Sequence, residues 1–257
     1  MSDNLRHGLS EDDAPILLVH GLIGTLEDLV AEFERAGVRA YAPDLLGYGA
    51  YAQVAADGIQ LHGQVAHLKR WLDERGISRV RLVGHSVGGA IAMLFARAHP
   101  ERVVSIVNVE GNFSLADAFW SGQVARMSAQ EAEVMLHGFR ADPAGWLARS
   151  GVAPDTGRLE AASRLLSAQP AATLQATARS VLEVTGSSSY EADLRAVFAA
   201  GAPVLLVAGE RSRGGWSVPE WATAAAAGER VLAGGHLLML EDPAGFVRSV
   251  ADFPALS

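Results

Sequence analysis

The sequence of 257 residues contains no cysteine, which excludes disulfide bonds, zinc–thiolate sites and a catalytic thiol. It also lacks any apolar run close to the roughly 20 residues that a membrane-spanning helix requires. Residues 1–14 are polar and acidic and do not resemble a signal peptide. We therefore expect a cytoplasmic protein that does not associate with a membrane.

Clusters of lysine and arginine are absent as well, and the formal net charge is -8. Nucleic-acid binding needs positive charge matched to the phosphates, so this balance argues against a nucleic-acid partner. The composition is globular, with 49% hydrophobic and 19% charged residues, in a chain long enough for one α/β domain with an insertion. We expect the partner to be a small-molecule substrate, and the sequence does not indicate an oligomeric state.

Short apolar segments alternate with helical segments along most of the chain. Fully apolar runs are typical of buried parallel strands, whereas apolar residues three and four positions apart are typical of helices. The pattern predicts strands at residues 16–19, 38–42, 79–83, 103–109, 203–208 and 229–232. Helical crossovers between strands give a mostly parallel sheet with helices on both faces, and reactive groups gather at the carboxyl ends of its strands.

The alternation stops between about residues 114 and 185, where only helical signals occur. Ser128 and Glu131 form a capping-box pattern, Asp142 precedes a proline, and Pro170 opens a further helix. An all-helical stretch inside an alternating series predicts a cap over the active site.

The segment Gly84-His85-Ser86-Val87-Gly88-Gly89 lies between a predicted strand and a predicted helix. A serine hydroxyl is a weak nucleophile, so it must be held where a base can reach it and where hydrogen-bond donors face it. A tight strand-to-helix turn does this, and glycines around the serine allow the close approach of neighbouring chain. The setting therefore predicts that Ser86 is a catalytic nucleophile.

Three motifs in this order resemble the α/β-hydrolase superfamily over essentially the full length of the chain. They are His20-Gly21-Leu22-Ile23-Gly24, Gly84-His85-Ser86-Val87-Gly88-Gly89 and Gly235-His236. The resemblance implies an α/β-hydrolase fold with a core at residues 1–112 and 186–257 and a helical cap insertion at residues 113–185.

The same resemblance implies roles for individual residues. Ser86 would be the nucleophile and His236 the general base, while the backbone N–H groups of Leu22 and Val87 would form the oxyanion hole. No metal and no organic cofactor is implied. His20 and His85 are expected to support the catalytic turns rather than to react.

The chain departs from the family at the position of the triad acid. The family usually has Gly-x-x-Asp after the penultimate strand, but here the segment is Gly209-Glu210-Arg211-Ser212. Glu110 follows the strand after the nucleophile and is the expected replacement, with Glu210 a weaker candidate because its side chain should point to the other face. A weak dyad without an acid is the remaining possibility.

The resulting expectation is a serine esterase that cleaves carboxylic esters or a related acyl bond through an acyl-enzyme. Phe113, Trp120 and Trp146 in the helical stretch are expected to line the substrate pocket. Two alternatives stay open. One is a cofactor-free lyase resembling the menaquinone-pathway enzyme that makes 2-succinyl-6-hydroxycyclohexadiene carboxylate, which would use arginines of the cap (Arg126, Arg140, Arg149 and Arg164). The other is a non-catalytic ligand receptor.

Overall fold

The computed structural model describes residues 14–253, so the acidic segment 1–13 lies outside the described residues. These residues form a six-stranded parallel sheet with the order β2-β1-β3-β4-β5-β6. The strands are β1 (Ile16–Val19), β2 (Ala40–Tyr41), β3 (Val80–His85), β4 (Val103–Val109), β5 (Val204–Gly209) and β6 (Gly228–Leu232). All six predicted strands are confirmed, with ends shifted by up to two residues.

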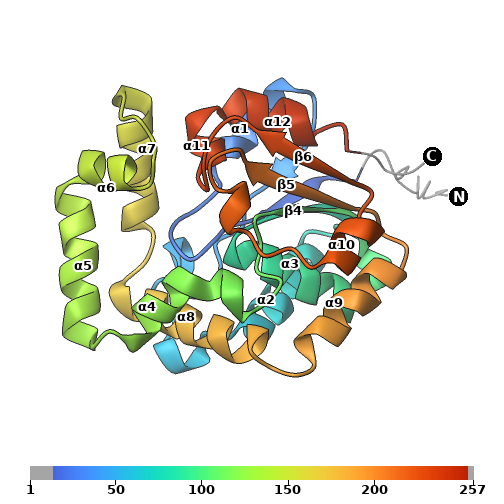
Figure 1. Ribbon diagram of the computed structural model, residues 1–257, viewed down its shortest axis with the longest axis horizontal. Helices are drawn as coiled ribbons and strands as arrows, with labels where there is room; N and C mark the ends of the chain where they lie inside the picture. Colours follow the sequence, from blue (N-terminus) through green and yellow to red (C-terminus); the bar gives the residue numbers. More distant parts are fainter. Residues whose placement is uncertain (1–13, 254–257) are drawn as a thin grey trace, which may run out of the picture.

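Helices cover both faces of the sheet (Figure 1). On one face lie α1 (Asp28–Arg35), α11 (Leu238–Glu241) and α12 (Pro243–Val250), and on the other lie α2 (Leu61–Glu74), α3 (Val87–Ala98), α9 (Tyr190–Ala199) and α10 (Glu220–Ala225). The strands bury side chains in both directions, because Ile16 and Leu18 pack with Phe33 of α1 whereas Leu17 and Val19 belong to the core that contains α2 and α3. Burial on both faces is why the strands are continuous apolar runs.

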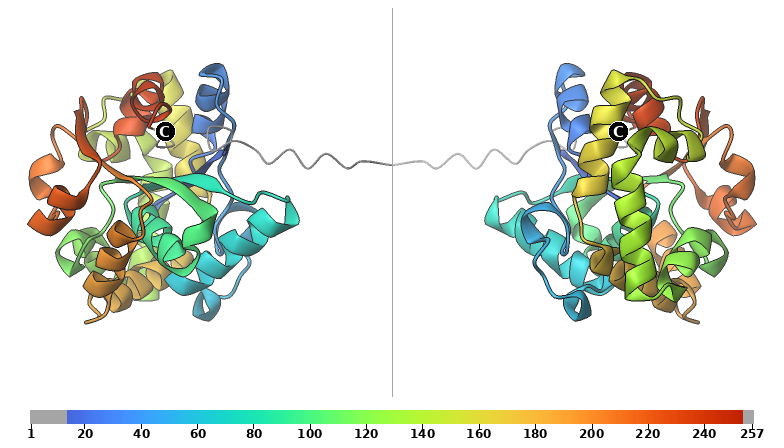
Figure 2. Two further views of the ribbon diagram at one scale, coloured as in Figure 1. Left: turned by 90° about the vertical axis from the view of Figure 1, so that its right-hand side faces the viewer. Right: turned by 90° about the vertical axis from the view of Figure 1, so that its left-hand side faces the viewer.

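The chain between β4 and α9 is helical, as the sequence predicts. It forms α4 (Phe119–Arg126), α5 (Ala129–Ala141), α6 (Pro143–Arg149), α7 (Thr156–Ser167) and α8 (Ala171–Thr185). The Ser128 hydroxyl accepts from the Glu131 N–H, and the Asp142 carboxylate accepts from the Gly145 N–H, so both predicted helix starts are confirmed. Helices α5 and α7 lie side by side beyond the sheet, whereas α8 also contacts α2 (Figure 2). The division into a core and a cap at residue 113 stays a prediction.

Two local features were not part of the sequence analysis. Helix α1 begins at Asp28, and the Thr25 hydroxyl accepts from the Glu27 N–H in the turn before the helix. The four-residue α11 was not predicted, because so short a helix has no periodicity to detect. Within residues 14–253, no helix is both long and apolar enough to span a bilayer.

Gly88 provides a test of the packing between α3 and the sheet. A β-carbon at Gly88 would lie 2.0 Å from the main-chain oxygen of Val19, whereas one at Gly138 on α5 would meet no atom within 4 Å. Gly88→Ala should therefore lower the free energy of unfolding by about 3 kcal/mol or more through overpacking. Gly138→Ala should raise it by about 0.5–1 kcal/mol through helix propensity. Urea denaturation measures both, and equal effects of the two substitutions would contradict the packing described.

Candidate active site

Ser86 lies in the sharp turn that joins β3 to α3. Its φ of 55° is in the left-handed region that residues with a side chain rarely adopt, and its N–H donates to the Val109 carbonyl of the adjacent strand at 2.9 Å. The glycines around it meet backbone: a β-carbon at Gly84 would lie 2.4 Å from the Gly88 oxygen, and one at Gly89 would lie 2.6 Å from Gly111. The strain at Ser86 is therefore maintained by backbone contacts that only glycine permits.

Glu110 lies in a second strained turn, at the end of β4. Its φ is 46°, and its N–H donates to the Val207 carbonyl of β5. The Asn108 side-chain oxygen accepts from the Gly111 N–H at 2.8 Å, which closes the turn, and the Trp216 indole N–H donates to the Gly111 carbonyl. The backbone of Glu110 is thus held from both β5 and its own strand.

His236 lies in the loop between β6 and α11. The loop is held by the Glu241 carboxylate, which accepts from the Gly235 N–H at 2.7 Å and pairs with Arg211. Glu241 therefore anchors this loop. Its neighbour Asp242 caps α12, because its carboxylate accepts from the Gly245 N–H.

The structure brings Glu110 and His236 into direct contact. Glu110 Oε2 lies 2.6 Å from His236 Nδ1, and Oε1 accepts from the Gly209 N–H at 2.8 Å and from the Ser212 hydroxyl at 2.5 Å. The Glu110 side chain is only 4% exposed, whereas that of His236 is 46% exposed. Burial by itself would raise the pKa of the Glu110 carboxyl, but the hydrogen bonds from His236, Ser212 and Gly209 outweigh it and hold that pKa below its usual value. Glu110 is therefore an anion at neutral pH.

The other two candidate acids lie elsewhere. Glu210 is exposed at the surface and makes no hydrogen bond to His236 within residues 14–253. Ser212, which takes the place of the usual aspartate, contacts the Glu110 carboxylate and makes no hydrogen bond to His236 in the described part of the chain. Glu110 is thus the carboxylate that meets the imidazole.

Two further histidines lie beside the site and are neutral. His85 Nε2 donates to the main-chain oxygen of His236 at 2.9 Å, and His20 Nδ1 lies 2.9 Å from the Gly21 oxygen. Burial lowers the pKa of His20 to about 4, and burial together with the nearby His236 lowers that of His85 to about 3. Both rings therefore stay uncharged over the pH range of most enzymes.

The proposed oxyanion donors, the N–H groups of Leu22 and Val87, flank Ser86. Val87 is the first residue of α3, where main-chain N–H groups have no partner within the helix. Among residues 14–253, neither N–H donates to another protein group. The main-chain oxygen of Leu22 accepts from the buried Tyr48 hydroxyl at 2.8 Å, which holds this loop in place. Both N–H groups are thus unpaired within the described residues, as the predicted oxyanion hole requires.

Ser86, Glu110 and His236 line one cavity of about 450 Å³. No hydrogen bond joins Ser86 Oγ to His236 in the described residues, and such bonds often tighten only when substrate binds. Trp120 and Trp146 line the cavity as predicted. Sequence reasoning missed several lining residues, whose side chains are brought in by tertiary packing: Asn112, Asp117, Ser121, Ser150 and Leu237.

The prediction that Phe113 lines the pocket is wrong. Its side chain is 3% exposed and does not line the cavity, because it packs into an aromatic cluster with Phe198, Trp216 and Trp221. The cluster lies between the turn after β4 and the helices α9 and α10. From the sequence, an apolar side chain so close to the site could either line the pocket or pack in the core. The side chain of Phe113 points into the core.

Of the four arginines considered for substrate binding, Arg149 lines the cavity. Arg140 instead donates to the main-chain oxygens of Leu166 and Gln169, and Arg164 pairs with Asp28. These two therefore hold helices together. In the part of the chain that the structure describes, no group of three or more His, Asp or Glu side chains is arranged to hold a metal ion.

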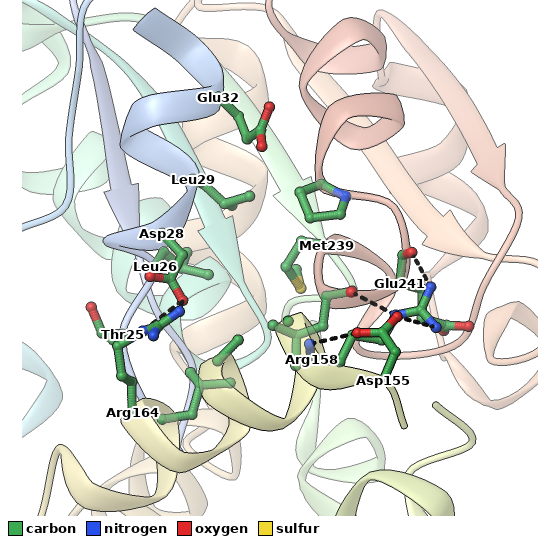
Figure 3. Close-up of a pocket in the computed structure, with 15 residues that line it drawn as sticks. Thr25, Leu26, Asp28, Leu29, Glu32, Asp155, Arg158, Arg164, Met239 and Glu241 are labelled. Carbon is green, nitrogen blue, oxygen red and sulfur yellow. Dashed lines mark hydrogen bonds and ion pairs between the residues drawn. The ribbon is translucent and has the colours of Figure 1, made fainter. Parts of the chain in front are cut away.

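A second cavity of about 440 Å³ lies between α1, α7 and α11 (Figure 3). Its floor is apolar and includes Leu29 and Met239. The arginines at its edge are already bound, because Arg164 donates to Asp28 at 2.9 Å and Arg158 donates to main-chain oxygens of α11. The cavity contains none of the predicted catalytic residues. The Arg164–Asp28 ion pair links α7 to α1, and the hydrogen bonds of Arg158 link α7 to α11.

A model of the alpha/beta hydrolase family matches residues 16–249, so the chain belongs to this family. Relatives include epoxide hydrolase 3 of Siraitia grosvenorii, which is 38% identical over 103 residues (38% of this chain and 32% of that protein). The 2-hydroxymuconate semialdehyde hydrolase of Pseudomonas putida is 43% identical over 70 residues (27% and 25%). Lipase 3 of a Moraxella species is 27% identical over 114 residues (44% and 35%). The matched region thus covers only about a third or less of the length of these relatives.

Solved structures match over nearly the whole chain. A carboxylesterase structure from Nitrososphaera gargenis has a TM-score of 0.67 at 17% identity and covers 95% of this chain and 90% of its own. A thermophilic esterase of Thermogutta terrifontis has a TM-score of 0.66 at 20% identity and covers 93% and 89%. At such identities these similarities establish the fold alone.

The two buried histidines predict how stability depends on pH. Below pH 6.5 the unfolded chain protonates both, whereas the folded chain does not protonate His20 until about pH 4 or His85 until about pH 3. The free energy of unfolding should therefore fall as the pH falls from 6.5 to 5, by up to about 1.4 kcal/mol per pH unit for each histidine. Urea denaturation at pH 7.5, 6.0 and 5.0 measures this slope.

Histidine variants distinguish the contribution of the buried rings from the destabilisation that other groups cause at low pH. His85→Gln should reduce the slope between pH 7.5 and 5.0, while replacement of the exposed His62 by glutamine should leave it unchanged. An identical slope in the wild-type protein and His85→Gln would show that the buried ring is not responsible.

Proposed function

We propose that the protein hydrolyses carboxylic esters through an acyl-enzyme on Ser86. The observation that carries the proposal is the 2.6 Å contact between the Glu110 carboxylate and His236 Nδ1 at the cavity that also exposes Ser86. A serine, an imidazole and a buried carboxylate in this order form the arrangement that activates a hydroxyl for acyl transfer. The lipases among the relatives support the same chemistry.

In this mechanism, His236 uses its free Nε2 to take the proton of Ser86 as the hydroxyl attacks the ester carbonyl. Glu110 accepts the Nδ1 proton of the imidazole, which fixes the tautomer and stabilises the imidazolium that forms. The oxyanion is bound by the N–H groups of Leu22 and Val87, each worth roughly 3 kcal/mol in the transition state. His236 then returns the proton to the leaving alcohol, and the same steps with water release the acid. These proposed steps require no metal or organic cofactor.

The cavity favours an ester with an apolar or aromatic group. Trp120, Phe139 and Trp146 supply flat apolar surface, and Leu22 and Leu237 lie near the reacting end. Arg149 adds a positive charge, and its nearest carboxylate, that of Asp142, is 3.9 Å away. A substrate that combines an aromatic or apolar group with an oxygen-rich one therefore matches the lining.

The alternatives from the sequence are weakened to different extents. The receptor hypothesis depended on a missing acid, and Glu110 supplies one. The lyase hypothesis needs several cationic partners, but Arg140 and Arg164 are bound to other protein groups. Assay of the menaquinone-pathway intermediate beside a simple ester distinguishes the lyase directly.

Ser86→Ala tests the nucleophile. The variant should lower the rate of p-nitrophenyl acetate hydrolysis by at least about 10³-fold, because the covalent step is lost. Mass spectrometry of the wild-type protein treated with a fluorophosphonate should find the modification on the peptide that contains Ser86. Undiminished hydrolysis by the variant would contradict the proposal.

Glu110→Gln tests the acid. The amide cannot stabilise an imidazolium and favours the wrong tautomer, so kcat should fall by about 10³-fold with little change in KM. Glu210→Gln, which removes the exposed carboxylate from the neighbouring loop, should retain wild-type kcat. If the two substitutions have the same effect, Glu110 is not the triad acid.

A further inference from the structure

Ser212 makes the shortest contact of the Glu110 carboxylate. Its hydroxyl lies 2.5 Å from Glu110 Oε1 and 3.3 Å from the main-chain oxygen of Gly209. A hydroxyl has one proton to donate, and an ionised carboxylate is the stronger acceptor. The proton therefore goes to Glu110, and Ser212 acts on the acid rather than on the imidazole.

Glutamate needs such a contact because its carboxylate rotates about a broad terminal torsion. Oε1 accepts from the Ser212 hydroxyl and from the Gly209 N–H, while Oε2 faces His236 Nδ1. Two donors on one oxygen fix the plane of the carboxylate and leave the other oxygen for the imidazole. Without the Ser212 hydroxyl, Oε1 would keep only the Gly209 N–H as a donor, and the plane of the carboxylate would be less firmly fixed.

The loop that carries Ser212 is held independently of Glu110. The Ser212 N–H donates to the Gly209 oxygen at 3.1 Å, and the N–H groups of Glu210 and Arg211 donate to the oxygens of Leu232 and Gly234. The last two bonds tie this loop to the segment that leads to His236. The hydroxyl is thus positioned by the same backbone that positions the base.

The charge of the site also favours a hydroxyl at this position. A carboxylate at residue 212 would lie against the buried anion of Glu110, and like charges at that distance force one of the two to take up a proton. Serine instead donates a hydrogen bond, which stabilises the ionised form of Glu110. A neutral donor is therefore the side chain that a triad acid at position 110 requires there.

We propose that Ser212 is a positioning residue, which orients the Glu110 carboxylate toward His236 by donating a hydrogen bond to Oε1. The inference rests on the proposed ester hydrolysis. It assigns a specific task to the residue that replaces the family's aspartate, which the sequence alone left as a sign either that the acid had moved or that the site was a weak dyad.

Ser212→Ala, Ser212→Thr and the matched control Ser217→Ala test this role. Ser217 lies on the same loop with its side chain exposed. Ser212→Ala should lower kcat for p-nitrophenyl acetate by about 10-fold, because a charge-assisted hydrogen bond is lost, and should leave KM unchanged because Ser212 does not line the cavity. Ser212→Thr retains the hydroxyl and should keep at least roughly half of the wild-type kcat, and Ser217→Ala should match the wild type.

The Glu110→Gln background separates positioning from a structural effect. If Ser212 acts through the carboxylate, Ser212→Ala should change kcat by less than about 2-fold once that carboxylate is gone. The rate of Ser86 modification by a fluorophosphonate, which does not depend on the natural substrate, should follow the same pattern. Equal losses in both backgrounds, or an unchanged kcat in Ser212→Ala with a wild-type melting temperature, would overturn the inference.

The activity of the wild-type protein distinguishes a failure of this inference from a failure of the proposed function. A wild-type protein that neither hydrolyses the ester nor reacts with the fluorophosphonate at Ser86 would refute the proposed function itself. An active wild-type protein with an unaffected Ser212→Ala variant would refute only the role of Ser212.

Discussion

The hydrogen bond between the Glu110 carboxylate and His236 Nδ1 depends on where β4 and β5 end relative to each other. Both strands end at the same edge of the parallel sheet, so a side chain from β4 can reach across the end of β5 to the loop that follows β6. Aspartate is one methylene shorter. The extra length of glutamate and the turn at its backbone together close the distance, and the buried carboxylate stays ionised only because donors surround it.

Ser86, the proposed nucleophile, and Glu110, the proposed acid, share one packing arrangement. Ser86 and Glu110 are the two residues other than glycine with positive φ among residues 14–253. Their turns touch through Gly89 and Gly111, where a β-carbon on either would approach the other's backbone to within 2.8 Å. Strain of this kind persists only where the surrounding structure enforces it, and it is concentrated at functional positions. A side chain added at either glycine would therefore displace the other turn.

The sequence predicted the strands because burial on both faces demands continuous apolar runs, and it predicted the nucleophile turn because its glycines are required by backbone contacts. It also indicated Glu110, since a carboxylate at the end of the next strand was the nearest replacement for a missing aspartate. The prediction that Phe113 lines the pocket was wrong, because an apolar residue near the site is equally compatible with the core and with the pocket. Ser121 and Ser150 were not identified, because their approach to the cavity depends on how α4 and α6 pack.

The sequence by itself thus determined the order of the elements, the strand-end positions of the reactive residues and the absence of an aspartate at position 212. These depend on local patterns of apolar residues, glycines and charges along the chain. Only the tertiary structure decided that Glu110 meets His236, that Ser212 donates to the carboxylate, and which aromatic residues face the cavity. Those contacts join positions up to 126 residues apart, and their geometry depends on side-chain directions that no local pattern specifies.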